Sequence, residues 1–146
     1  MASPPNIHAS DSSEQRAAET EILAVLERHL GIRLDGSPDI PLRVRPDGFA
    51  DGPTPTCVEV WAHQGKAKSA QTAKVMKDMC KLLLVEKQLG RQCRKIVAVC
   101  DPDALSFLQN SWQGKFAEEF GIERIVVDVD DATRDRIRQA QTRQYR

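Results

Sequence analysis

Apolar residues recur at helical spacing in two long segments of the chain. In residues 13–30 an apolar stripe runs through ILAVLERHL, and either Ser12 or Ser13 fits the helix N-cap, with Gly31 as the stop signal. In residues 69–89 the same periodicity continues over about six turns. The pattern therefore predicts two amphipathic helices that pack on a common core.

Three segments carry strand patterns instead. Residues 42–47 alternate apolar and polar positions and predict a strand ending near Asp47. Residues 57–64, CVEVWAHQ, alternate strictly, so that Glu59 and His63 share one face. Residues 95–100, KIVAVC, form a continuous apolar run typical of a strand buried on both faces.

The remaining segments complete an α/β order. A short strand is predicted over 32–34, a helix over 101–121 and a last strand over 122–129. An antiparallel hairpin then feeds a βαβαβ unit, whose strands pair in parallel through right-handed crossovers. The predicted fold is a mixed sheet flanked by helices.

The domain organisation follows from length and composition. A chain of 146 residues suits one domain. Residues 1–12 are rich in Pro, Ser and Asn and are predicted to be disordered, residues 13–130 to form the single domain, and residues 131–146 to be an Arg-rich tail or frayed helix.

Charge is balanced overall, with 21 basic and 21 acidic residues, but it is distributed unevenly. Residues 1–40 carry a net charge of −4, and residues 63–95 carry +7. The whole chain thus has no electrostatic signature of a nucleic-acid or membrane protein, while the basic block either attracts phosphates or forms a solvated helix face.

The four cysteines are widely spaced and form no CxxC pair, which favours buried free thiols over a zinc site. No apolar run approaches the roughly 18 residues of a membrane span, and the N-terminus lacks the apolar region of a secretory signal. We therefore expect a soluble, cytoplasmic protein without membrane association.

Two acidic residues lie on the predicted hairpin, Asp47 near the end of its first strand and Glu59 within the second. Side chains directly opposite each other on a hairpin come within about 4.5–5.5 Å. Two carboxylates that close repel each other unless a cation lies between them or one takes a proton. Mg²⁺ suits such a pair, although Pro-Asp-Gly is also ordinary turn sequence and an exposed Glu on a strand is common.

Several motifs together resemble a known superfamily. Pro46–Asp47, an eleven-residue gap and Glu59 between apolar β residues resemble the PD-(D/E)xK, or restriction-endonuclease-like, nucleases. DGF, VEVWAHQGKAKSAQTAKVMKDMCKLLLVEK and RKIVAVCD are similar to a little-characterised bacterial group within it, over roughly residues 14–130. The resemblance implies the αβββαβ core of that superfamily, here with an additional αβ unit.

The resemblance also implies roles for particular residues. Asp47 and Glu59 would hold Mg²⁺ or Mn²⁺, with Glu19, or failing that Glu21, as the additional helix carboxylate. Glu19 continues the apolar stripe of its helix by one turn, so it points toward the core face. Gln71 corresponds to a glutamine that some members place near the scissile phosphate.

The catalytic lysine of the superfamily is missing from its usual place. Two residues after Glu59 the chain has Trp61. Some members move the lysine to the neighbouring helix, and Lys74 is then the first candidate, with Lys66 the second. The four residues that share one face of that helix are Gln71, Lys74, Asp78 and Lys81.

Other polar residues near the motif are candidates for substrate binding. His63, Lys66, Lys68 and Lys74 are expected to contact nucleic acid, although His63 fits a hydrogen-bonded structural role equally well. Trp61 fits core packing better than base stacking.

Three functions compete on this evidence. The first is a metal-dependent endonuclease acting on DNA, for which a homodimer would supply two sites. The second is a catalytically inactive member of the same fold that binds nucleic acid or protein, which the displaced lysine favours. The third is a small regulatory α/β protein, in which Asp47 and Glu59 would lie well apart with no lysine near either.

Overall fold

The computed structural model describes residues 7–41 and 44–144, and in these residues five helices surround one four-stranded sheet. In chain order the elements are α1 (Ile7–Leu30), β1 (Gly48–Ala50), β2 (Thr56–Trp61), α2 (Ser69–Leu89), β3 (Arg94–Val99), α3 (Pro102–Asn110), α4 (Trp112–Glu119), β4 (Ile122–Val126) and α5 (Asp131–Gln144). The predicted α/β class is confirmed.

The strands lie in the order β1-β2-β3-β4. β1 pairs antiparallel with β2, while β2 pairs in parallel with β3 and β3 with β4. The predicted hairpin and the parallel pairing are therefore correct. The short strand predicted over 32–34 is wrong: there the chain makes only one parallel bridge, from Asp35 to Phe49.

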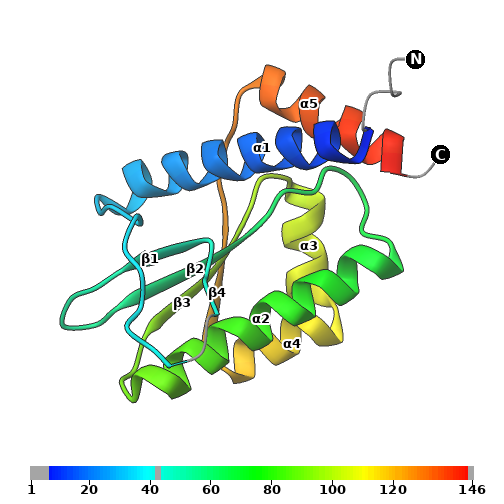
Figure 1. The fold of residues 1–146 in the computed structure, drawn as a ribbon. Coiled ribbons are helices and arrows are strands. Elements are labelled where there is room, and N and C mark those ends of the chain that lie inside the picture. The colour runs from blue at the N-terminus through cyan, green and yellow to red at the C-terminus, as the bar shows by residue number, and fades with distance from the viewer. Residues whose placement is uncertain (1–6, 42–43, 145–146) are drawn as a thin grey trace.

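The molecule has three layers, with the sheet between two groups of helices (Figure 1). α1 packs on β2 and β3, and α5 packs on α1. On the other face α2, α3 and α4 cover the sheet (Figure 1). Each interface holds its own cluster of buried apolar side chains.

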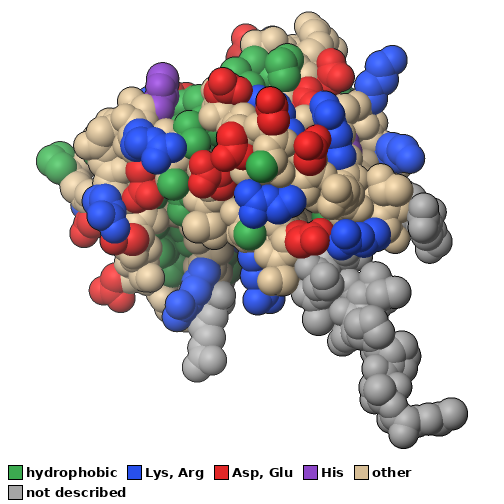
Figure 2. Space-filling model, turned by 90° about the horizontal axis from the view of Figure 1, so that it is seen from above, with side chains coloured by type: hydrophobic (Ala, Val, Ile, Leu, Met, Phe, Trp, Pro, Cys, Tyr) green, Lys and Arg blue, Asp and Glu red, His purple; other side chains and the backbone are tan. Residues whose placement is uncertain are grey.

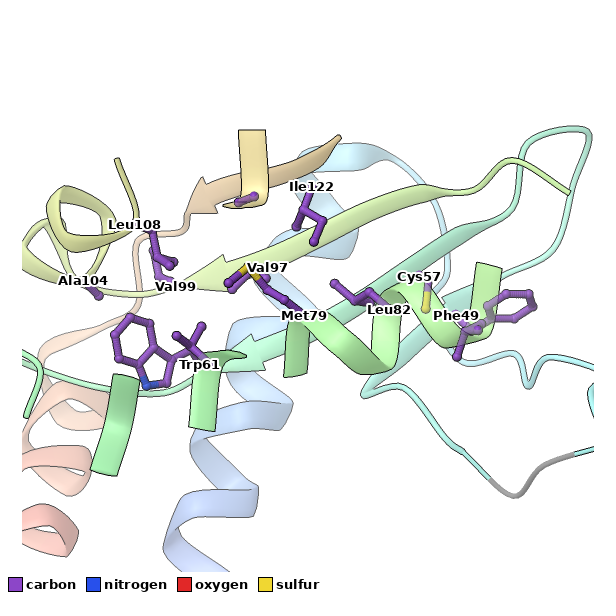
Figure 3. Packing of buried hydrophobic residues seen from close by; sticks show 13 residues of the cluster. Phe49, Cys57, Trp61, Met79, Leu82, Val97, Val99, Ala104, Leu108 and Ile122 are labelled. Atoms are coloured by element: carbon purple, nitrogen blue, oxygen red, sulfur yellow. The ribbon is translucent and has the colours of Figure 1, made fainter. Parts of the chain in front are cut away.

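β2 is the strand that organises both clusters, because all six of its residues are buried. Cys57 and Trp61 belong to the cluster under α2 and α3. Figure 3 shows both side chains among the other buried residues of this cluster. Val58 and Val60 belong to the cluster under α1. The predicted alternation of faces is confirmed, and the strand is buried on both faces because helices cover both sides of the sheet.

α1 begins at Ile7, earlier than the predicted N-cap at Ser12 or Ser13. α1 thus includes residues 7–12 of the segment that the sequence predicts to be disordered, and the rest of that segment lies outside the described residues. Residues 7–12 contain no Gly or Pro, so nothing in their sequence breaks the helix. The predicted end is correct, since Gly31 follows the helix with φ +70°.

β1 begins after Asp47, whereas the sequence predicted a strand ending there. The predicted strand lies partly outside the described residues, at 42 and 43. Pro46 has no N–H to give to a ladder, so regular pairing cannot extend back through it. Asp47 consequently lies just before the strand, at the end of the hairpin opposite its turn.

The single helix predicted over 101–121 is two helices, α3 and α4. Ser111 ends the first and caps the second, because its hydroxyl accepts a hydrogen bond from the Gly114 N–H at 3.1 Å. Gly114 lies so close to α3 that a Cβ there would come within 2.3 Å of the Leu108 carbonyl oxygen. The break therefore depends on one cap and one glycine.

The segment predicted as a tail or frayed helix is α5, a helix of 14 residues packed on α1. Ile137 and Ala140 are 4% and 5% exposed. Two apolar residues three positions apart are enough to bury one side of the helix, although they make no strong stripe in the sequence. The folded unit thus continues beyond residue 130.

Candidate functional site

Asp47 and Glu59 lie opposite each other at the open end of the β1–β2 hairpin. The pairing of Gly48 with Val58 places them in register one step further along. The Asp47 N–H donates to Glu59 Oε2 at 3.3 Å, and the Val60 N–H donates to Asp47 Oδ2 at 2.8 Å. These carboxylates accept hydrogen bonds from backbone N–H groups at the point where the β1–β2 ladder ends. The third hypothesis, which required the two acids to lie apart, is wrong on this point.

Glu59 is the most buried acid of the site, with 1% of its surface exposed. Burial, and then the hydrogen bond and charge of Asp47, raise the pKa of Glu59 to about 9. Asp47 itself is exposed. The pair thus joins a nearly inaccessible carboxyl group to one that solvent or a ligand can reach.

The lysine that reaches this pair is Lys81, whose ammonium group forms an ion pair with Glu59 Oε1. Burial lowers the pKa of Lys81, but its bond to Glu59 and the charges of Glu59 and Asp47 outweigh burial and raise it. Lys81 follows Lys74 by seven residues, or about two turns of α2. The sequence placed Lys81 on the correct helix face but did not show which turn crosses Glu59.

The two lysines that the sequence preferred lie elsewhere. Lys74 forms an ion pair with Asp78 at 2.8 Å on its own helix. Lys66 is exposed in the loop between β2 and α2. Neither makes a direct contact with Glu59 among the described residues, so Lys81 replaces both as the lysine of the carboxylate pair.

Trp61 explains why no lysine stands two residues after Glu59. Its side chain shares the α2 face of β2 with Glu59, is 2% exposed and meets the edge of the Phe107 ring at a centroid distance of 5.9 Å. A lysine at this position would place its ammonium in the apolar core. Lys81 instead approaches Glu59 from α2.

Glu19 is half-buried on α1 and is electrostatically part of the site. Burial first, and then the charge of Asp47, raise the pKa of Glu19, while Lys74 acts in the opposite direction. Of the two candidate carboxylates on α1, Glu19 is thus the one whose pKa is raised by the charge of Asp47. Within the described residues, however, no three His, Cys, Asp or Glu side chains lie close enough to share one metal ion.

A cavity of about 390 Å³ opens between α1, α2, α5 and the end of β2. Gln71 and Lys74 line it from α2, and Gln15 lines it from α1, where its amide donates to Glu19 Oε1 at 3.5 Å. Gln71 also caps α2, since its Oε1 accepts from the Lys68 N–H at 2.8 Å. The cavity therefore connects two of the predicted site residues with the surroundings of Glu19.

His63 lies in the cavity wall and has a structural role. Its ring stacks on Trp61 with centroids 5.5 Å apart and 10° between the planes. Its Nε2 lies 3.0 Å from the Lys66 carbonyl oxygen, which requires the proton on Nε2 for a hydrogen bond. His63 thereby fixes the loop that carries Lys66 and Lys68.

The basic block of residues 63–95 is largely neutralised in the fold. Among the described residues, five of its nine cations are seen in ion pairs with carboxylates, namely Lys74, Lys81, Arg91, Arg94 and Lys95. The face formed by α1 and α5 likewise carries acidic and basic side chains side by side (Figure 2). Two further cations of the block, Lys66 and Lys68, line an open groove at the β2–α2 loop.

The four cysteines are free, and three of them are buried as predicted. Cys80 is the exception, because it lies on the exposed side of α2. The predicted burial is therefore wrong for this residue alone.

The sequence was compared with models of protein families and with curated proteins, and neither comparison found a match. Among the helices of residues 7–41 and 44–144, none is both long and apolar enough to cross a membrane.

Proposed function

We propose that this chain is a metal-dependent nuclease-like hydrolase that cleaves phosphodiester bonds in DNA, on a restriction-endonuclease-like fold. The observation that carries the proposal is the contact between Asp47 and Glu59, with Lys81 on Glu59. Two adjoining carboxyl groups with an ammonium group beside them fit the chemistry of phosphodiester hydrolysis. The order helix, hairpin, helix and parallel strand supports the fold, although one bridge at Asp35 stands where a further strand of the αβββαβ core would be.

The donor set suits Mg²⁺ or Mn²⁺. Both are hard ions that bind carboxylate oxygens, and Mg²⁺ is typically held by one or two carboxylates, with phosphate and water oxygens as further ligands. Asp47 and Glu59 would hold the ion, and Glu19 adds negative charge near Asp47. A bound ion polarises a phosphodiester and lowers the pKa of a water molecule.

The chain's own residues supply the remaining functions. Lys81 holds a positive charge beside Glu59, where it can stabilise charge that develops on a phosphoryl group. Gln71 and Lys74 line the cavity at the end of β2 and would orient the substrate there. Lys81 thus takes the role that the sequence assigned to Lys74 or Lys66.

A second candidate is a catalytically inactive member of the same fold that binds nucleic acid. The observation that favours it is again the Lys81–Glu59 ion pair, because it compensates the buried carboxyl group without a metal ion. Metal binding would then be weak and turnover absent.

The test is cleavage of plasmid DNA with and without Mg²⁺ or Mn²⁺. Asp47→Ala and Glu59→Ala should each lower metal-dependent cleavage by roughly 100-fold or more, and Lys81→Ala by a similar factor. The matched controls are Asp51→Ala, an exposed acid at the hairpin turn, and Lys77→Ala, an exposed lysine on α2.

Cleavage that persists unchanged in both acid variants would exclude the proposed site. DNA binding without cleavage in the wild type, under either metal, would select the second candidate. Loss of cleavage in Lys74→Ala but not in Lys81→Ala would return the role of the lysine to Lys74.

A further inference from the structure

The β2–α2 loop and α5 form the two walls of a groove, and they are tied together by one pair of residues. The Gln64 N–H donates to Gln141 Oε1 at 2.8 Å, and Gln141 Nε2 donates to the Gln64 carbonyl oxygen at 3.0 Å. In Figure 1 this loop passes beneath the C-terminal part of α5. The two walls are therefore held at a fixed spacing, although they lie 77 residues apart in the chain.

The groove has a volume of about 620 Å³ and a basic lining. Lys66 and Lys68 line it from the loop and Arg138 from α5, and no acidic residue is among its lining residues in the described chain. The side chains of Lys66 and Arg138 form no ion pair with a described residue, in contrast to Lys74 and Lys81. Uncompensated cations on facing walls attract a polyanion.

Gln64 lines the same groove, and one atom of its side-chain amide lacks a hydrogen-bond partner in the described structure. The Gln64 side chain is 4% exposed, and its Nε2 donates a hydrogen bond to the Cys100 carbonyl oxygen at 3.2 Å. Its Oε1 is buried without a donor in the described structure, which is a costly state for a carbonyl oxygen.

The groove adjoins the cavity that lies between α1, α2, α5 and the end of β2. His63 and Gln141 line both spaces, and Lys74 lines the cavity on the far side. A strand lying in the groove would thus reach the cavity that Gln71 and Lys74 line.

We propose that α5 is part of a nucleic-acid interface, in which Arg138 together with Lys66 and Lys68 binds backbone phosphates of the strand that leads to this cavity. This inference rests on the nucleic-acid substrate of the proposed function. It assigns to α5 a part in binding, in addition to its packing against α1.

The test measures binding of a fluorescein-labelled DNA duplex by fluorescence anisotropy in EDTA, over a series of KCl concentrations. Lys66→Gln and Arg138→Gln should each weaken binding several-fold, and the double variant by roughly 10-fold or more. Each substitution should reduce the slope of log affinity against log salt by about one. Arg136→Gln is the matched control, because it removes the same charge from α5 outside the groove.

Affinity and salt slope of the double variant equal to those of the wild type would overturn the inference, as would the absence of DNA binding by the wild type at low salt. If cleavage still requires Asp47 and Glu59 while the double variant binds normally, only the groove assignment fails. If groove variants lose binding but the wild type cleaves no DNA with either metal, only the nuclease assignment fails. Unchanged thermal unfolding of each variant ensures that these comparisons concern binding.

Discussion

Glu59 combines three properties at the scale of a single residue: it is almost fully buried, it faces another carboxylate, and it is paired with a lysine. Removing a carboxylate from water disfavours its charged form, and Asp47 adds repulsion. Lys81 offsets only part of this, so the pKa of Glu59 rises from 4.5 to about 9. The charged form of Glu59 is therefore destabilised in the folded protein, a cost that an apolar residue at the same position would not carry.

A pH dependence of stability follows from this shift. An acid whose pKa is higher in the folded than in the unfolded chain keeps its proton longer when folded, so stability falls as pH rises from 4.5 toward 9. Between about pH 5 and pH 8.5 we expect the free energy of unfolding of the wild type to fall by on the order of 2 kcal/mol more than that of Glu59→Gln. Urea unfolding at both pH values measures the difference. Identical pH slopes in the two proteins would contradict the assignment of a raised pKa to Glu59.

At the scale of elements, the break between α3 and α4 shows how one cap and one glycine divide a continuous helical pattern. Residues 101–121 contain a single proline, Pro102, at the start of the segment. The sequence therefore predicted one helix. Ser111 ends α3 with its own hydroxyl bonded to the Phe107 carbonyl oxygen at 2.5 Å. Gly114 then lets α4 start in contact with the end of α3.

Gly114→Ala tests the role of this close approach. Its Cβ would lie 2.3 Å from Leu108 O and 2.6 Å from Leu108 C, and backbone atoms cannot move aside as a flexible side chain can. We expect a loss of about 1–3 kcal/mol in the free energy of unfolding, measured by urea denaturation. Lys115→Ala, at an exposed position on the same helix, should leave stability nearly unchanged. Equal stability of the two variants would show that α3 and α4 separate without strain.

At the scale of the whole molecule, the two ends of the described chain form one layer. α5 packs on α1, and Arg143 forms an ion pair with Glu14 at 3.0 Å. Ile137 joins the cluster that lies under α1 and also lines the cavity between α1, α2, α5 and the end of β2. Helix α5 therefore contributes both to the core and to the wall of this cavity.

The contribution of α5 to stability is testable through Ile137→Ala. Removing a buried aliphatic side chain that is 4% exposed should lower the free energy of unfolding by about 2–4 kcal/mol. Gln139→Ala, at an exposed position of α5, is the control and should have little effect. Thermal unfolding monitored by circular dichroism measures both. A midpoint unchanged by Ile137→Ala would mean that α5 behaves as the tail that the sequence predicted.

The sequence alone determined the elements whose patterns are local. Alternation in residues 57–64 assigned Glu59 and Trp61 to one face of a strand, and Gly90, with φ +68°, ends α2 where the periodicity stopped. It also singled out Asp47 and Glu59 as a pair, because a hairpin brings facing residues together whatever the rest of the chain does. These features depend on residues near each other in the chain.

Only the tertiary structure decided which lysine meets Glu59 and what becomes of the C-terminal segment. The choice among Lys66, Lys74 and Lys81 depends on the turn of α2 that crosses β2, and this is set by how far the connecting loop carries the chain before the helix begins. The helix α5 is stabilised by contacts with α1, more than a hundred residues earlier, and not by its own weak stripe. Helical periodicity identifies a face, but docking between distant elements selects the residues of that face that meet.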